Sequence, residues 1–189
     1  MDRKVKMKSH PSLLAFLLLT SCLATHVAHA ERADRNKPVN LEADRVTVDD
    51  IKRVHIFEGN VLLTQGSLTI KSAKLVVTQD AEGFQKGVAS GGADGLARFR
   101  QKREGRDEYV DGEGERIEYD SRSEKSEFFT RAYVKSGVDE VRGNYIQYDG
   151  ITEQYLVTAV PGAKPGTPGG RVTAIIQPKS VKNATPAKP

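Results

Sequence analysis

The chain has 189 residues, a formal net charge of +4 at pH 7 and a single cysteine at position 22. Four basic residues and one acid lie within the first eight positions, so the rest of the chain carries 25 basic against 24 acidic residues, and its charge gives no support for nucleic-acid binding. Because no cysteine follows position 22, that part of the chain cannot contain a disulfide framework, a catalytic thiol or a cysteine-ligated zinc site.

The first 30 residues have the organisation of a secretory signal peptide. The basic segment is followed by an apolar run at 13–24, which is too short to cross a bilayer comfortably, and by a small-residue tripeptide at 28–30. We therefore predict cleavage after Ala30, which leaves a mature, exported chain of 159 residues. The segment Leu19–Cys22 also fits a bacterial lipoprotein box, and lipidation of Cys22 is the alternative that the mass of the mature protein distinguishes.

Between Val39 and Ile176 the sequence predicts strands and no substantial helix. No window keeps apolar residues at the i, i+3, i+4 and i+7 positions of a helix, whereas short alternating runs are separated by Gly, Asp, Asn and Ser. Strands are expected at 38–42, 44–49, 53–58, 60–65, 67–71, 73–78, 95–102, 115–120, 126–130, 132–136, 139–143, 145–149, 153–159 and 171–176. The Pro/Gly-rich segment 161–170 predicts a long loop, and the tail 179–189 predicts disorder after a β domain that spans 31–178.

The expected strands contain a weak internal repeat. One seven-residue phrase occurs four times, at 43–49, 72–78, 114–120 and 143–149. A shift of 71 residues aligns the first half of the domain with the second and places Phe57 on Phe128. In each copy two apolar residues stand two positions apart and share one strand face, while three of the four residues between them are polar. The pattern predicts two sheets, or one rolled sheet, closed over an apolar interior.

Candidate catalytic and metal-binding residues are few. His55 is the only histidine after position 30, so a cupin-like metal site lacks its ligands, and no G-x-S-x-G nucleophile motif occurs. The glycine-rich run 87–95 lacks the Lys-Ser/Thr of a phosphate loop and is interpreted as a hairpin loop. Asp111, Glu113 and Glu115 alternate along a strand but lack the spacing of a calcium loop, so a turn or strand-entry role for Glu115 is favoured over calcium. We expect no metal, no cofactor and no enzymatic activity.

A short basic segment at 98–106 is the remaining charged feature. Alternation along a strand points Phe99 toward the interior and the neighbouring cations outward, namely Arg98, Arg100 and Lys102. Such a ridge beside an apolar interior suits an amphiphile with anionic phosphates. A solvated strand and turn is the ordinary role of a charge run. Both interpretations stay open at this point.

The succession of motifs resembles the LptA family, the OstA-like lipopolysaccharide transport proteins of the periplasm. The motifs are "PVNLEADRVTVDD", "FEGNVLLTQGSLTIKSAKLVV", "ERIEYD", "RGNYIQY" and "RVTAIIQP", which run from Pro38 to Pro178. The resemblance implies an open antiparallel β-jellyroll whose apolar interior shelters lipid A acyl chains. It also implies head-to-tail assembly into a bridge from the inner-membrane complex that contains LptC to the outer-membrane protein LptD. The positions that it places in contact with lipid are Val39, Leu41, Phe99 and Tyr119.

The resulting hypothesis is a non-enzymatic lipopolysaccharide carrier of the periplasm. Its lipid-binding interior is expected to consist of Val39, Leu41, Val46, Val48, Val61, Leu63, Ile70, Leu75, Val77, Phe99, Ile117, Tyr119, Ile146 and Tyr148. Arg98, Arg100 and Lys102 are the candidate residues for a contact with lipid phosphates, with a solvated strand as the alternative. The alternative is a structural or polysaccharide-binding β-solenoid of the cell envelope with a fully packed interior, and an envelope hydrolase on the same fold comes third.

Overall fold

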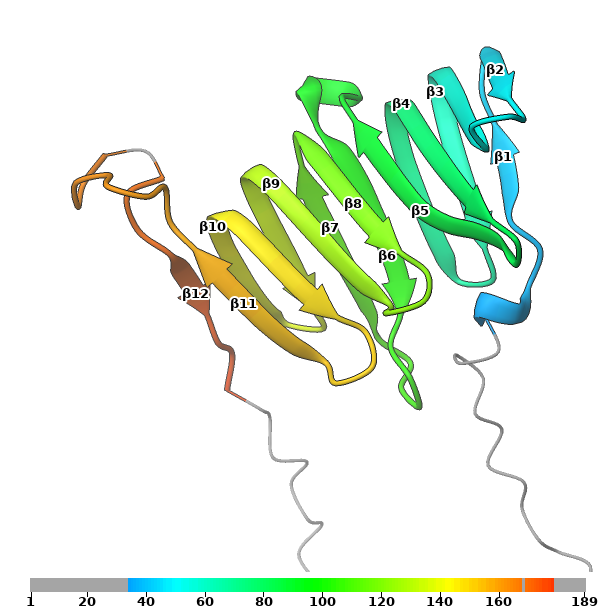
Figure 1. The fold of residues 1–189 in the computed structure, drawn as a ribbon. Helices are drawn as coiled ribbons and strands as arrows, with labels where there is room; N and C mark the ends of the chain where they lie inside the picture. The colour runs from blue at the N-terminus through cyan, green and yellow to red at the C-terminus, as the bar shows by residue number, and fades with distance from the viewer. Residues whose placement is uncertain (1–33, 168, 179–189) are drawn as a thin grey trace, which may run out of the picture.

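The computed structural model describes residues 34–167 and 169–178, and these ranges contain strands and two short 3-10 turns but no α-helix (Figure 1). The predicted all-β class is therefore confirmed. The strands are β1 (Asn40–Glu42), β2 (Arg45–Asp49), β3 (Val54–Gln65), β4 (Leu68–Asp80), β5 (Gly83–Ser90), β6 (Ala97–Lys102), β7 (Tyr109–Gly114), β8 (Arg116–Asp120), β9 (Lys125–Ser136), β10 (Asp139–Asp149), β11 (Gln154–Thr158) and β12 (Thr173–Ile175), with η1 (Asp34–Asn36) before β1 and η2 (Ala93–Gly95) before β6.

The two chain ends lie largely outside the described residues. The predicted signal peptide at 1–30, the alternative lipidation site Cys22 and the expected disorder of 179–189 all fall there. Within the described ranges, no helix has the length and apolar character needed to cross a membrane.

Four long strands, β3, β4, β9 and β10, each take part in two sheets. In β4, residues 69–71 pair with β6, whereas residues 74–80 pair with β5. In β9, residues 125–129 pair with β8, and the later part of the strand pairs with β7. The register of the β3–β4 pair shifts between Glu58 and Val61, which marks a bulge at the point where the strand changes sheet. β10 divides in the same way between β11 and β12.

The half-strands form two sheets that share one core. The first sheet contains β2, β5, β8 and β11, the second contains β1, β6, β7 and β12, and the long strands contribute one half to each. In the described chain, every passage between the sheets lies on one side, which we call the bent edge: 43–44, 59–60, 72–73, 91–96, 115, 130–131, 143–144 and 159–172. The turns on the other side join strands of the same sheet, and we call this side the free edge: 50–53, 66–67, 81–82, 103–108, 121–124, 137–138 and 150–153. The backbone therefore connects the two sheets along the bent edge alone.

Strand pairing closes a ring in the middle of the molecule and leaves both ends unpaired. β4, β5, β8, β9, β7 and β6 pair in that order and return to β4. The resemblance implied an open jellyroll, but these six strands form a closed ring, because β4 and β9 belong to both sheets. At one end of the molecule β1 and β2 form the margin of the two sheets, and at the other end β11 and β12 do so (Figure 1). The jellyroll and the internal repeat stay predictions, although the bounds of β2 and β3 recur 71 residues later as those of β8 and β9.

Side chains on the facing surfaces of the two sheets form one apolar core. Buried and less buried positions alternate along β4 and β6, as the period of two of a strand requires. The buried core residues are at most 3 % exposed, and burial of one Leu or Ile side chain is worth about 1.5–3 kcal/mol. The core, which both sheets line, is therefore the main source of stability of the fold.

A repeated aspartate closes turns at the free edge. Asp49 and Asp149 end β2 and β10, and each accepts a hydrogen bond at 2.9 Å from the backbone N–H three residues later, that of Lys52 or Thr152. An Asp side chain that binds its own backbone in this way stabilises a turn. These backbone N–H groups hold the pKa of both carboxyl groups below the ordinary value. The aspartate that ends the repeated phrase is therefore a turn residue.

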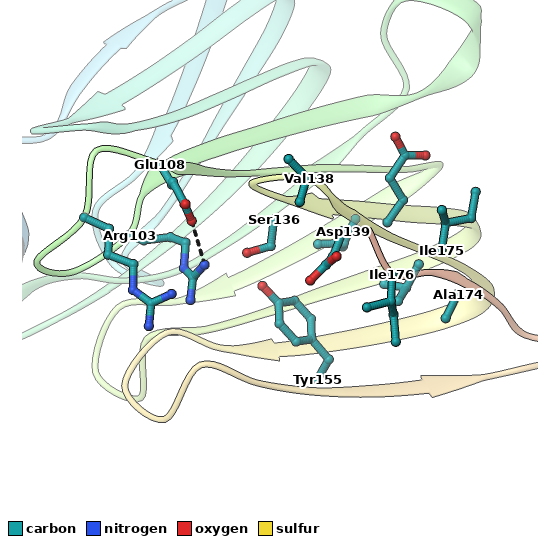
Figure 2. A pocket seen from close by; sticks show the side chains of 13 residues that line it. Arg103, Glu108, Ser136, Val138, Asp139, Tyr155, Ala174, Ile175 and Ile176 are labelled. Carbon is teal, nitrogen blue, oxygen red and sulfur yellow. Dashed lines mark hydrogen bonds and ion pairs between the residues drawn. The ribbon is translucent and has the colours of Figure 1, made fainter. Parts of the chain in front are cut away.

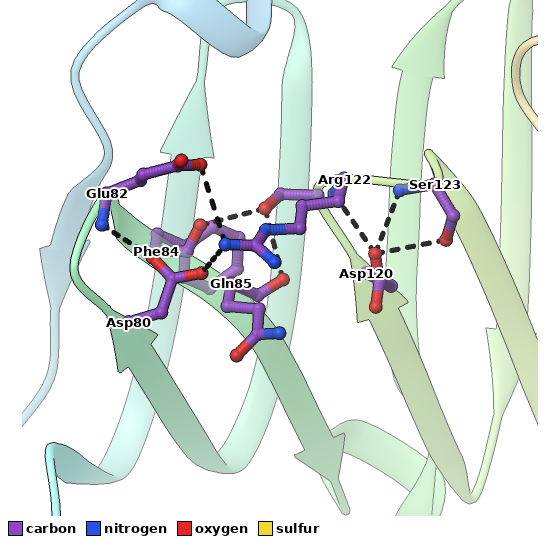
Figure 3. A network of polar contacts seen from close by, with 8 residues as sticks. Asp80, Glu82, Phe84, Gln85, Asp120, Arg122 and Ser123 are labelled. Atoms are coloured by element: carbon purple, nitrogen blue, oxygen red, sulfur yellow. Dashed lines mark hydrogen bonds and ion pairs between the residues drawn. The ribbon is translucent and has the colours of Figure 1, made fainter.

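Polar contacts along the free edge also link neighbouring turns of the first sheet. Arg122, after β8, pairs with Asp80 and Glu82 beside the β4–β5 turn (Figure 3). The Ser121 hydroxyl donates a hydrogen bond of 2.8 Å to the carbonyl oxygen of Phe84. All of these groups belong to the first sheet, so the contacts stiffen that sheet and do not hold it against the second.

Two strands, β5 and β7, were missed in the sequence. The glycine-rich run 87–95 is not a hairpin loop throughout, because its first four residues belong to β5. The acidic stretch around Asp111 is β7. Each strand has a buried glycine, Gly87 in β5 and Gly112 in β7, where the apolar side chain that signals an inward position is missing. The alternation of apolar residues is broken there, and the period of two is lost.

Candidate functional site

The interior between the sheets is the candidate site, because most of the residues that the sequence assigned to it meet there. Ten of them are buried in the core: Val61, Leu63, Ile70, Leu75, Val77, Phe99, Ile117, Tyr119, Ile146 and Tyr148. Val39 and Leu41 are partly buried and pack against this core at the β1 end. Their contact with lipid stays a prediction.

The sequence predicted that Val46 and Val48 on β2 are enclosed in the interior. They are instead half exposed, at 52 % and 50 %. They pair with Phe57 and His55 of β3, which in turn pair with buried residues of β4, so both valines do lie on the inner face. β2 is the outermost strand of the first sheet at this end, and no further strand of the described chain lies beyond it to cover its inner face. The two valines therefore line an open end of the interior.

The centre of the interior is filled by aromatic side chains from both sheets. Phe99 of β6 packs edge-on against Phe128 of β9, with ring centroids 5.6 Å apart, and lies 6.4 Å from Tyr119 of β8. The Phe128 ring occupies the space beside Gly112 of β7, where an added Cβ atom would lie 2.2 Å from its Cε1 atom. Phe128 and Tyr119 belong to the first sheet and Phe99 and Gly112 to the second, so these contacts hold the sheets together.

Several interior residues were not predicted from the sequence. Phe128 is the largest, and its 71-residue offset from Phe57 was a signal that could have placed it on the inner face. The others lie on the missed strands, beside small residues or at strand ends: Leu68, Ala89, Ala97, Val110, Ala132 and Val134.

At the end formed by β11 and β12, the interior opens into a pocket of about 550 Å³, which we call the C-terminal mouth. Its wall includes Val134 of the core, Tyr155 of β11 and Ile176 after β12. Figure 2 shows Tyr155 between the side chain of Arg103 and those of Ile175 and Ile176. Ile175 and Ile176 are 45 % and 79 % exposed and lie next to each other at the rim of this pocket, and a contiguous exposed apolar surface of this kind suits a binding partner.

An ion pair crosses the free edge from sheet to sheet at this mouth. Arg103, in the β6–β7 turn of the second sheet, donates from Nε and Nη2 to Glu153, in the β10–β11 turn of the first, at 3.2 and 2.5 Å. Its Nη1 donates to Glu108 of its own turn at 2.9 Å. The bond from Arg103 holds the pKa of Glu153 below the ordinary value, and the same bond raises the pKa of Arg103. A bidentate, partly buried pair of this kind is among the stronger ionic contacts of proteins.

The predicted basic ridge lies on the outer face of the second sheet, where each cation is paired with a carboxylate. The pairs are Arg98–Glu113 at 3.2 Å, Arg100–Asp111 at 2.8 Å and Lys102–Asp107 at 3.2 Å. Contact of these cations with phosphate stays a prediction. Two of the carboxylates are those weighed as calcium ligands, and no group of three or more His, Cys, Asp or Glu in the described residues is placed to hold a metal ion.

The fold and the site define an all-β protein built of two sheets around an apolar interior. The family described as the LptA/(LptD N-terminal domain) LPS transport protein matches residues 40–154. The lipopolysaccharide export system protein LptA of Haemophilus influenzae is 31 % identical to this chain, over 88 % of the chain and 92 % of the relative, and LptA of Escherichia coli K12 is 26 % identical, over 97 % and 98 %. The chain therefore belongs to the LptA/(LptD N-terminal domain) family, and the family predicted from the motifs is confirmed.

A solved structure shows the same fold. The crystal structure of LptH, the LptA homologous periplasmic component of the lipopolysaccharide transport device of Pseudomonas aeruginosa, matches this chain with a TM-score of 0.69. The match has 25 % sequence identity and covers 77 % of this chain and 99 % of LptH.

Proposed function

We propose that the chain is a periplasmic carrier of lipopolysaccharide and that the acyl chains of lipid A bind between its two sheets. Membership of a family of lipopolysaccharide transport proteins supports this role. The observation that carries the binding site is the continuous apolar inner face, which leads from the buried core to the C-terminal mouth beside Tyr155 and Ile176.

Acyl chains supply enough free energy to part the sheets. Each methylene removed from water is worth about 0.8 kcal/mol, so a twelve-carbon chain gains on the order of 9 kcal/mol. Parting the sheets breaks the contacts of Phe99 and Phe128, but an acyl chain that enters covers the same apolar surfaces. Because one apolar contact replaces another, the net cost is far below that of exposing the core to water. The free edge is the side at which the sheets can separate while the bent edge keeps them connected.

The alternative, a structural or polysaccharide-binding β-solenoid, has one observation in its favour. The centre of the interior is filled by Phe99, Tyr119 and Phe128, as a packed solenoid requires. A packed solenoid has no use for an open pocket whose rim carries the exposed apolar residues Ile175 and Ile176, and this difference favours the carrier.

Assembly follows from the two margins of the sheets. Strands β1 and β2 at one end and β11 and β12 at the other present backbone groups that another chain can pair with. Different surfaces at the two ends produce a head-to-tail stack, in which both sheets and the interior continue from copy to copy. In this proposal the end copies of the stack dock with LptC on the inner-membrane side and with LptD on the outer-membrane side.

A photo-crosslinking amino acid at Tyr155 should label lipopolysaccharide, whereas one at Leu156 should not. The two residues are adjacent on β11, but Tyr155 lines the mouth and Leu156 is 55 % exposed on the opposite face of the strand. Immunoblotting for lipopolysaccharide after irradiation measures the difference. Leu41 and the outward Glu118 provide a second pair away from the mouth. Equal labelling of both faces would refute the interior as the binding site.

Replacement of Glu153 by Gln should speed the uptake of lipid. The amide keeps the shape of the side chain but loses the negative charge that Arg103 holds across the free edge. Its NH2 group also cannot accept the second of the two hydrogen bonds from the guanidinium. A loss of about 1.4 kcal/mol in the contact between the sheets corresponds to about tenfold faster uptake of a fluorescent lipopolysaccharide in a stopped-flow experiment.

Glu108→Gln is the matched control for this variant. Glu108 binds the same guanidinium but belongs to the same turn, so its loss removes an ion pair without loosening one sheet from the other. Uptake that is equally fast in both variants, or unchanged in Glu153→Gln, would show that the Arg103–Glu153 pair does not control the separation of the sheets.

A further inference from the structure

The bent edge at the C-terminal end carries a pocket of about 530 Å³, and the described residues that line it include three arginines and no acidic residue. Arg131 is paired with Glu115 at 2.8 Å, and Arg142 approaches Glu140 at 3.7 Å. Within the described part of the chain, the side chain of Arg171 has no ion pair or hydrogen bond. We call this site the arginine pocket, and its unbalanced positive charge suits a carboxylate from another molecule.

A carboxylate of the required kind lies at the opposite end of the molecule, on the same bent edge. Glu42 is the last residue of β1 and is exposed, and its carboxylate has no ion pair or hydrogen bond within the described ranges. Glu42 pairs in the sheet with Leu62. Because the next residue, Leu63, is buried and faces inward, Leu62 and Glu42 lie on the outer face of the second sheet.

The strand directions at the two ends allow one copy to continue both sheets of the next. β1 runs toward the bent edge and β12 runs away from it, so the two lie antiparallel when copies stack with their bent edges aligned. β2 runs away from the bent edge and β11 runs toward it, so the second junction is antiparallel as well. Antiparallel pairing at both margins extends the two sheets through a single contact between copies.

The inner and outer faces of the end strands determine the register of this contact. Leu41 of β1 faces inward, and Ala174 of β12 pairs with Val141, which packs on the core. Pairing Leu41 of one copy with Ala174 of the next keeps both residues inward. The same register sets Glu42 opposite Thr173 on the outer face.

Thr173 lies in the lining of the arginine pocket. Thr173 pairs with Arg142 on β10. Arg171 precedes Thr173 by two residues, so the Arg171 side chain is in diagonal reach of a residue that stands opposite Thr173. We propose that Glu42 of one copy binds in the arginine pocket of the next, beside Arg142 and Arg171, and thereby sets the register and polarity of the stack. This inference rests on the head-to-tail assembly of the proposed function and adds the residues that specify it. Two C-terminal ends brought together would oppose arginine with arginine, so the same charges disfavour the wrong contact.

Charge reversal tests the contact on the mature chain. Glu42→Arg and Arg171→Glu should each raise the dissociation constant of self-association at least tenfold at low salt, measured by sedimentation equilibrium over a range of protein concentrations. An equimolar mixture of the two variants should associate again, because every junction of an alternating stack then pairs opposite charges. One chain that carries both changes should also associate. Lys164→Glu, the same charge change in the same loop but outside the arginine pocket, should leave the dissociation constant unchanged.

The outcomes separate this inference from the function on which it rests. Single variants that associate as well as the unchanged chain, or a mixture that fails to recover although both variants keep their circular dichroism spectra, would overturn the Glu42 contact and leave assembly in place. An unchanged chain that stays monomeric at every concentration would overturn the head-to-tail assembly and the contact together. Binding of lipid to the interior is judged independently, by the crosslinks at Tyr155.

Discussion

Phe128→Ala is expected to lower the free energy of unfolding by about 3–5 kcal/mol, the range for a large aromatic side chain removed from a core. The Phe128 ring is fully buried, packs edge-on against Phe99 and fills the space beside Gly112. Its contacts come from both sheets, so the surrounding side chains cannot close the cavity without moving one sheet against the other. Urea unfolding followed by circular dichroism measures the loss.

Phe129→Ala is the matched control, because the neighbouring residue points to the outer face of the same strand. Its ring is partly exposed, lies 5.2 Å from the ring of Tyr145 and is covered by the guanidinium of Arg116 at 3.9 Å. The loss of these contacts should cost about 1 kcal/mol. If Phe128→Ala were no more destabilising than Phe129→Ala, the aromatic centre would not be what holds the sheets together.

The period of two in the apolar residues was sufficient to predict the all-β class and most of the interior. Leu75 and Val77, or Ile117 and Tyr119, stand on one face of a strand whatever the strand pairs with, so their inward position follows from local geometry. The same argument fails where glycine replaces the apolar residue. Gly112 is an inner-face position, but the residue that fills its space is Phe128 from another strand, and the sequence around Gly112 contains no sign of it.

Features that depend on distant pairing could not be predicted from the sequence. Val46 and Val48 have the same local pattern as the buried pairs, and their exposure reflects only the position of β2 at the margin of a sheet. Arg103 and Glu153 are 50 residues apart in two turns, and their contact requires both the pairing order and the separation between the sheets. Most of the candidate site is thus a property of single strands, whereas its openings and the ion pair across its free edge are properties of the assembled sheets.

Gly112→Ala should destabilise the protein by about 1–3 kcal/mol, although alanine is ordinarily the better residue in a strand. The added Cβ atom would lie 2.2 Å from the Cε1 atom of the fully buried Phe128 ring, so the ring would have to shift against its neighbours in the core. Gly87→Ala is the matched control on an inner face of the first sheet. Its Cβ atom would meet Leu75 and Phe84 at an ordinary 3.4 Å, so this change should be neutral or stabilising by about 0.5–1 kcal/mol.

The double variant Gly112→Ala/Phe128→Ala isolates the contact between the two positions. In a protein that already carries Phe128→Ala, the methyl group added at position 112 enters a cavity instead of a filled space. Gly112→Ala should therefore raise the stability of that protein rather than reduce it further. The unfolding free energies of the four proteins should therefore give an interaction energy of about 1–3 kcal/mol between the two sites. Additive effects would mean that Gly112 is required by the backbone of β7 and not by Phe128. In that case the position of the Phe128 ring would not depend on Gly112, and an acyl chain that enters between the sheets would not have to break this contact.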